Sequence, residues 1–230
     1  AFSQNSWTQI YNKGLGTTVE QTADGGYIIL GGPDYSDSAT VLIKTNAYGD
    51  ITWLKTYALN NARAKFVKQA SDGGYVFCGG APGFLSKTDI DGAILWTETF
   101  SGPSAADILF RACDVADDGY VLTGYIADTS STLGWGSTDL IVLKTNFLGV
   151  EQWRKTYGLP DNGCTLGCAE DEGRAIRVLA SNEIVVAGDY GGGGYNSSTW
   201  NTWQGWLLKM DQYGDTIWTR KYGGNQLDMF

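Results

Sequence analysis

A stretch of fourteen residues recurs four times along the chain and constrains the fold more than any other feature. The copies begin at Lys44, Lys87, Lys144 and Lys209, as in KTNAYGDITWLKTY and KTDIDGAILWTETF. In every copy a Gly follows the Lys after five residues, a Trp follows that Gly after four, and a Tyr or Phe follows the Trp after four. Such in-register spacing is typical of a repeat architecture, in which equivalent residues solve the same packing problem in each unit.

A second repeated block lies between these copies. It reads ADGGYIILG, SDGGYVFCG, DDGYVLTG and SNEIVVAG, with an aromatic residue or Ile four residues before a Gly, and a short β-like run precedes it. Each unit therefore holds four extended segments, which in the second unit cover 65–70, 74–79, 83–88 and 94–100. Asp-Gly between the first two predicts a two-residue type I′ hairpin turn. Gly92 is expected at the position of the last turn that requires a positive φ.

Four-stranded antiparallel units of this length predict an all-β protein, a β-propeller that covers 1–230 as a single domain. The Trp residues follow one another after 46, 43, 57 and 65 residues, and the many Gly and aromatic residues fit tight turns between strands. The repeats are expected at about 7–52, 53–95, 96–152 and 153–217. The stretch 218–230 would begin a further repeat or supply a ring-closing strand.

The segment that ends each unit occurs five times, because Trp7 and Tyr11 repeat its spacing, whereas the other three segments occur four times. The sequence thus predicts four full repeats plus an extra fourth strand. Three explanations stay open: the natural chain continues into more blades, the extra strand closes a small ring, or it completes a neighbouring copy in an oligomer or filament.

The Trp column is predicted to dock one blade against the next rather than to stack on a ligand, since its place in the unit never varies. Its members are Trp7, Trp53, Trp96, Trp153 and Trp218. The repeated Lys is expected to contact a blade edge or a turn. Asp24, Asp72 and Asp118 are interpreted as turn formers rather than metal ligands.

Composition excludes several function classes. The net charge is −9 and the chain contains no His, so a nucleic-acid partner is not expected and His-dependent catalysis is excluded, whereas carboxylate pairs are not. No apolar run is long enough to span a membrane. Cys164 and Cys168 are candidates for a local disulfide, the state of Cys78 and Cys113 is open, and the C-x3-C spacing fits zinc poorly. No metal and no cofactor are expected.

The repeat resembles that of secreted bacterial and archaeal β-propeller proteins, such as surface proteins of Bacteroidota, whose consensus is DGGYI-x-x-G…LIKTD-x-x-GD-x-x-W-x-K-x-YGG. The matching stretches are DGGYIILGG at 24–32, LIKTNAYGDITWLKTY at 42–57 and LLKMDQYGDTIWTRKYGG at 207–224. The resemblance covers nearly the whole chain. It implies export and a secreted or cell-surface setting, often as one module of a larger protein. The fourth unit departs from it, with SNEIVVAG in place of the Asp-Gly block.

A weaker resemblance links Asp89, Gly92 and Trp96 to the tryptophan-docking motif of quinoprotein dehydrogenases, one residue short. It would imply a quinone cofactor and calcium, and a quinoprotein-like dehydrogenase stays a remote alternative.

Two long insertions, 126–139 and 189–205, break the repeat and are the places where function is expected. They hold the candidate ligand-binding residues Trp135, Asp189, Tyr190, Tyr195, Asn196, Trp200, Asn201 and Trp203. Exposed aromatic rings beside Asn and Asp favour stacking on sugars or gripping a protein surface. The same rings could instead fold onto the blade below and order a long loop.

The sequence therefore predicts a non-catalytic secreted or cell-surface propeller that mediates protein interaction or extracellular assembly. Its partner would be a protein or a glycan at the extracellular face, with self-assembly through the redundant strand as a further possibility. The alternative is a carbohydrate-binding module, or a glycan-active enzyme that uses loop aromatics and carboxylates. No catalytic residue can be named for such an enzyme.

Overall fold

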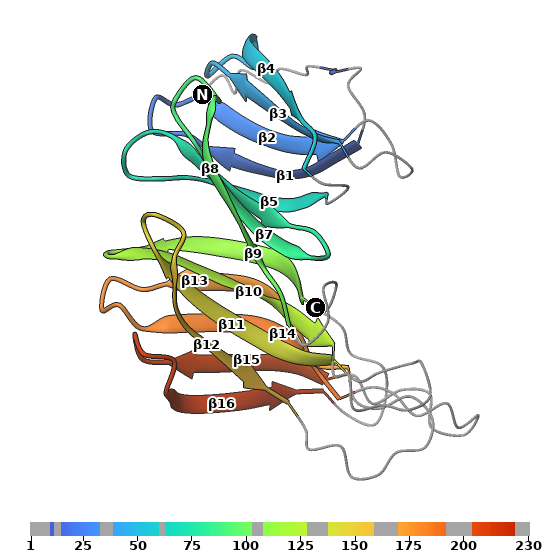
Figure 1. The fold of residues 1–230 in the computed structure, drawn as a ribbon, viewed down its shortest axis with the longest axis vertical. Coiled ribbons are helices and arrows are strands. Elements are labelled where there is room, and N and C mark those ends of the chain that lie inside the picture. The colour runs from blue at the N-terminus through green and yellow to red at the C-terminus, as the bar shows by residue number, and fades with distance from the viewer. Residues whose placement is uncertain are drawn as a thin grey trace, which may run out of the picture.

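The computed structural model describes residues 10–11, 15–32, 39–59, 63–102, 108–127, 138–158, 170–191 and 204–223. Within these ranges the chain forms sixteen β-strands and no helix. The strands group into four antiparallel sheets of four strands, and within each sheet the strands lie side by side in chain order (Figure 1). The all-β prediction is confirmed.

The four sheets are numbered here along the chain. Sheet 1 contains β1 (Leu15–Gln21), β2 (Tyr27–Gly32), β3 (Thr40–Thr45) and β4 (Ile51–Tyr57). Sheet 2 contains β5 (Ala64–Gln69), β6 (Tyr75–Gly79), β7 (Gly83–Thr88) and β8 (Ile94–Phe100). Sheet 3 contains β9 (Ile108–Ala116), β10 (Gly119–Ala127), β11 (Thr138–Asn146) and β12 (Glu151–Tyr157). Sheet 4 contains β13 (Glu172–Val178), β14 (Ile184–Tyr190), β15 (Gln204–Met210) and β16 (Thr216–Tyr222).

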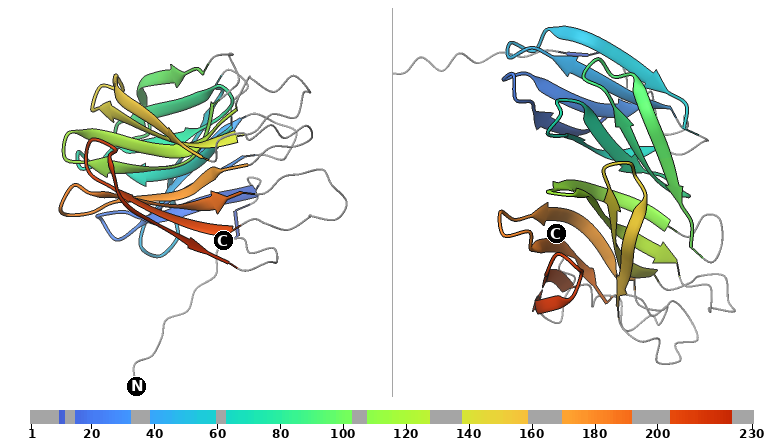
Figure 2. Two further views of the ribbon diagram at one scale, coloured as in Figure 1. Left: turned by 90° about the horizontal axis from the view of Figure 1, so that it is seen from below. Right: turned by 60° about the vertical axis from the view of Figure 1, so that its left-hand side comes forward.

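The sheets follow one another in chain order from top to bottom of Figure 1, and the right-hand view of Figure 2 shows the same order from another side. Three hydrophobic clusters lie between successive sheets of the described chain. The cluster between sheets 2 and 3, for example, joins Val76 and Leu85 to Phe110 and Leu122. The middle strands are therefore buried on both faces, as in β7, where all six residues are buried.

The first strands β1, β5, β9 and β13 contact one another from sheet to sheet, and each carries a β-bulge at the same place. The residues that the register skips are Thr17, Lys65, Arg111 and Arg174. Opposite each bulge the second strand has the Gly that recurs four residues after the aromatic residue or Ile. At Gly31 a Cβ atom would lie 2.5 Å from the carbonyl oxygen of Leu15, so the bulge itself requires glycine there.

In sheet 3 the turn between the first two strands has the predicted length, since Ala116 pairs with Gly119 and leaves Asp117 and Asp118 between them, but neither residue has the positive φ of a type I′ turn. In sheet 1 the turn differs in length as well. Gln21 pairs with Tyr27, which leaves a longer loop, and in the described chain Gly25 has a positive φ (81°) whereas Asp24 does not. The Asp24 carboxylate accepts the Gly26 N–H at 3.0 Å and so shapes the turn through its side chain rather than its backbone. In sheet 4 Asn182 (φ 62°) adopts the left-handed conformation in place of Gly.

The turn between the last two strands matches the prediction. Gly92 has φ 77°, and the equivalent glycines of the other sheets have values from 80° to 84°. In sheet 2 the Asp89 carboxylate accepts the N–H groups of Asp91 and Ala93 at 3.0 and 2.8 Å, which fixes the turn.

Candidate functional site

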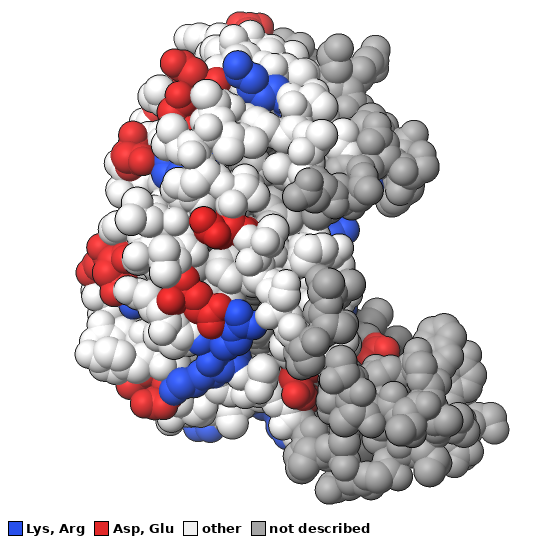
Figure 3. Space-filling model, viewed as in Figure 1, with Lys and Arg blue, Asp and Glu red and all other residues white. Residues whose placement is uncertain are grey.

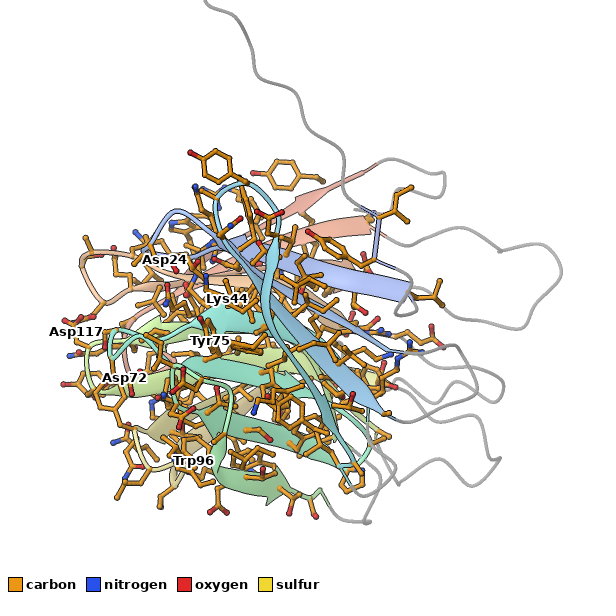
Figure 4. The ribbon with its side chains drawn as sticks, turned by 90° about the horizontal axis from the view of Figure 1, so that it is seen from above. Asp24, Lys44, Asp72, Tyr75, Trp96 and Asp117 are labelled. Atoms are coloured by element: carbon orange, nitrogen blue, oxygen red, sulfur yellow. The ribbon has the colours of Figure 1, made fainter. Side chains whose placement is uncertain are left out.

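The repeated Lys is a buried residue of the third strand, and it holds the first turn of its own sheet. Lys44 donates from Nζ to Asp24 at 2.8 Å and to the Thr45 carbonyl at 2.7 Å, and Figure 4 shows the first pair. The hydrogen bond from Lys44, with one from the Thr22 hydroxyl, holds the pKa of Asp24 well below its usual range. The expectation of a turn contact is met, but the Lys lies inside the sheet rather than at its edge.

Lys87 with Asp72 and Lys144 with Asp118 repeat this arrangement, at 2.9 and 2.8 Å. In sheet 4 the Lys209 ammonium instead meets Glu183 at 2.9 Å, and the lysine side chain is more exposed than in the other three sheets. These ion pairs account for the Lys and Asp columns as structural elements.

In sheets 1, 2 and 3 the Trp of the fourth strand contacts the following sheet. Trp53 lies 5.6 Å from the ring of Tyr75, edge to face, and a Cβ on Gly92 would lie 3.0 Å from its indole. Trp96 is placed in the same way against Tyr120 and Gly149. The positive φ and the missing Cβ of the turn glycine thus create the space that the preceding Trp fills.

The aromatic residue four positions after the Trp makes a second contact with the same turn. The hydroxyl of Tyr57 donates to the Gly92 carbonyl at 2.7 Å, and that of Tyr157 donates to the Gly214 carbonyl at 2.5 Å. Phe100 occupies the equivalent position in sheet 2 and has no hydroxyl to donate. The sequence spacing signals this contact, but only the structure identifies the acceptor.

Tyr11 occupies the same position in front of sheet 1. Its hydroxyl donates to the Gly49 carbonyl at 2.6 Å, as Tyr57 does to Gly92. Sheet 1 therefore receives the end of a segment of the fourth-strand type at its last turn. Trp7, the partner in this motif, lies outside the described residues.

On β16 of sheet 4, three residues occupy the positions of Trp153, Lys155 and Tyr157 on β12. These residues, Trp218, Arg220 and Tyr222, are called the docking face. The Tyr222 side chain is 47% exposed, whereas Tyr57 is 7% exposed. The Arg220 guanidinium lies 5.8 Å from the Trp218 ring centroid. Arg220 stands where sheet 3 has Lys155, whose ammonium pairs with Asp215 in the last turn of sheet 4.

Two of the predicted ligand-binding residues lie in the described chain, and both have structural partners. Asp189 is 1% exposed and accepts from Arg174 Nε at 2.6 Å. The Tyr190 ring packs edge to face on Trp206 at 4.9 Å, and the Lys221 ammonium lies 3.1 Å from its centroid. The other candidates lie outside the described residues: Trp135, Tyr195, Asn196, Trp200, Asn201 and Trp203.

Cys78 and Cys113 are free thiols buried between sheets 2 and 3. Burial, together with a hydrogen bond to Cys113, raises the pKa of the Cys78 thiol, which keeps it neutral and unreactive. The candidate disulfide partners Cys164 and Cys168 lie outside the described residues.

Within the described ranges, no group of three or more Cys, Asp or Glu residues is arranged to hold a metal ion. None of the described segments is a helix that could cross a membrane. Comparison with protein-family models and with curated proteins gave no match.

Proposed function

We propose that this protein is a non-catalytic β-propeller module, secreted or displayed at the cell surface, that acts through assembly. The propeller arrangement is supported by four equivalent sheets that dock face to face through one repeated set of contacts. The secreted or surface setting is supported by the resemblance of the repeat to exported propeller proteins.

The observation that carries the assembly proposal is the match between the docking face and the last turn of sheet 1. At the junction of sheets 3 and 4, Trp153 contacts Gly214, Tyr157 donates to the Gly214 carbonyl and Lys155 pairs with Asp215. The docking face offers the corresponding groups, namely the indole of Trp218, the guanidinium of Arg220 and the hydroxyl of Tyr222. The turn of sheet 1 offers Gly49, with φ 84°, followed by Asp50.

The occupant of the docking face is sheet 1 of a second copy. In that contact Trp218 fills the space beside Gly49, Tyr222 donates to the Gly49 carbonyl, and Arg220 pairs with Asp50 of the other copy. In the single chain Tyr11 donates to the Gly49 carbonyl, so Tyr222 of the other copy must displace it. The contact thus exchanges the chain's own N-terminal segment for β16 of the second copy. Repetition of the exchange builds a head-to-tail array.

Light scattering of the purified protein over a concentration series tests this proposal. We expect concentration-dependent growth in mass that Arg220→Asp abolishes, because the new carboxylate faces Asp50. Combining Arg220→Asp with Asp50→Arg should restore growth. Tyr11→Ala should promote it, because the intramolecular competitor is removed.

Leu148→Ser is the matched control, since Leu148 is 69% exposed in a turn of the interior sheet 3. It should leave the mass distribution unchanged. A wild-type protein that stays monomeric at every concentration, with Tyr11→Ala monomeric as well, would refute the assembly proposal.

A further inference from the structure

The bulge on the first strands places one residue of each sheet outside the regular pairing, and in three adjacent sheets that residue is basic. Lys65 on β5, Arg111 on β9 and Arg174 on β13 take this position, whereas sheet 1 has Thr17. A bulge re-aims the side chain of its extra residue and is frequent next to functional sites. The repeat fixes the backbone at this position and leaves the side chain free to vary.

Two of these cations share one carboxylate between sheets 3 and 4. Arg111 Nε lies 2.5 Å from Glu172 Oε1, and Arg174 Nη2 lies 2.9 Å from Glu172 Oε2. Arg174 Nε also donates to Asp189. Glu172 and Asp189 are almost completely buried, whereas about a third of each arginine side chain is exposed (32% and 35%). The carboxylates therefore hold the guanidinium groups in place from behind and leave part of each group accessible.

The third cation has no such partner. No Asp or Glu of the described chain forms an ion pair with Lys65, and its neighbours include Arg111 and Arg63. Burial first, and then the charges of Arg111 and Arg63, lower the pKa of Lys65. Like charges held together in a partly buried place are unfavourable unless an anion joins them. Lys65 thus supplies positive charge that no carboxylate of the described ranges neutralises.

These bulges lie where the first strands begin, on the same side of the molecule as the links between sheets. The space-filling view is hollowed on that side, and blue atoms show inside the hollow (Figure 3). Arg111 also stacks near the ring of Tyr125, with its guanidinium carbon 5.8 Å from the centroid, which fixes its orientation. An acidic neighbour, Glu170, has its pKa raised by burial and by the charge of Glu172, so it is more easily neutralised than an ordinary glutamate.

We propose that Lys65, Arg111 and Arg174 form a binding site for an oxyanion group, namely a carboxylate, sulfate or phosphate, of a ligand that enters through this hollow. Guanidinium groups bind such planar or tetrahedral oxyanions through paired N–H donors, and the lysine adds a point charge. The site is separate from the docking face on β16, so it stands or falls independently of the assembly proposal.

Isothermal titration calorimetry with sodium phosphate, sodium sulfate and an oligogalacturonate tests the site, with a neutral maltooligosaccharide as the reference ligand. Binding of the free ions identifies a small-anion site, and binding of the oligogalacturonate alone identifies an acidic glycan. Lys65→Gln and Arg111→Gln should each weaken binding about tenfold, because each removes a charge-assisted hydrogen bond. Arg174 is left intact, since its loss would strand the buried Asp189.

Arg177→Gln is the matched control, since Arg177 also lies on β13, is 58% exposed and is not the bulged residue. It should bind as the wild type does. Near-ultraviolet circular dichroism verifies that each variant is folded. The site is refuted if none of the anionic probes binds, or if folded Lys65→Gln and Arg111→Gln bind with unchanged affinity.

Discussion

The fourth strand and the first strand of each sheet follow opposite rules. On the fourth strand and the turn before it, the Gly and Trp are identical in all four sheets. Wherever a sheet follows, the Trp packs beside the turn Gly of that next sheet. At the bulge of the first strand the backbone is the same in all four sheets, but the residue is Thr, Lys, Arg and Arg in turn. A residue that is identical in all sheets lies where each sheet makes the same contact with its neighbour. A residue that varies lies where each sheet can acquire a role of its own.

The largest expected effect concerns the Trp column. Trp96→Ala removes the ring that fills the space between Tyr120 and Gly149, and it should lower the free energy of unfolding by about 3 kcal/mol. Trp218→Ala, on the face of sheet 4 turned away from sheet 3, should cost less than about 1 kcal/mol. Urea denaturation of both variants, at low protein concentration, measures the difference. Equal losses would show that the ring stabilises its own sheet rather than the junction.

The next largest effect on stability is expected for the buried lysines. Lys87→Met keeps the aliphatic stem but leaves the Thr88 carbonyl and Asp72 without their donor, which should cost about 2 kcal/mol. Lys209→Met should cost less, because the Lys209 side chain is 21% exposed against 4% for Lys87 and water can replace the lost ammonium group. Thermal or urea unfolding under one set of conditions compares the two. A larger loss for Lys209→Met would contradict the assignment of the ion pair in sheet 2 as the stronger one.

Much of this arrangement could be predicted from the sequence. The four segments of the second unit correspond closely to β5 to β8, because hydrophobic runs between Gly-containing turns identify strands locally. The bulges could not be predicted, since a bulge is a property of pairing between two strands and Lys65 looks like any polar residue of a half-exposed strand. The type I′ turn predicted from Asp-Gly is not formed in sheet 1, where Gln21 pairs with Tyr27 and the Asp24 carboxylate accepts the Gly26 N–H, a side-chain contact that the two-residue signal does not contain.

The candidate site, too, could be predicted only in part from the sequence. The functional prediction fell on aromatic, Asn and Asp residues of the long insertions because these insertions break the repeat. The described members of that set, Asp189 and Tyr190, are held by Arg174 and by Trp206 and Lys221. Arg111 and Glu172 come together from strands 61 residues apart in the chain, and no local pattern carries that information.

A smaller effect concerns the junction of sheets 2 and 3, where Phe100 stands in place of the tyrosine. Phe100→Tyr places a hydroxyl where Tyr57 and Tyr157 donate to the turn of the next sheet, and Gly149 supplies the carbonyl. The substitution should raise the free energy of unfolding by about 0.5 to 1 kcal/mol, the net value of one hydrogen bond. Tyr57→Phe should lower it by a similar amount. Urea denaturation measures both changes, and a destabilised Phe100→Tyr would show that this junction is packed too tightly to accept the oxygen.

The smallest expected effect is the pH dependence of the ion pairs in the first turns. Hydrogen bonds from Lys44 and Thr22 lower the pKa of Asp24, and for Asp72 burial acts in the opposite direction but is outweighed by Lys87 and the Gly74 N–H, so its pKa is lowered too. A depressed carboxyl pKa contributes stability that is fully present above the unfolded value of about 3.9 and is lost as the pH falls through the folded value.

Because both carboxylates are more than half exposed (63% and 60%), each contribution should stay below about 1 kcal/mol. Unfolding free energies measured from about pH 6 down to about pH 3 should therefore fall less steeply in the Asp24→Asn and Asp72→Asn variants than in the wild type. An identical slope in the wild type and both Asn variants would show that the ion pairs of the repeated turns do not carry the acid sensitivity.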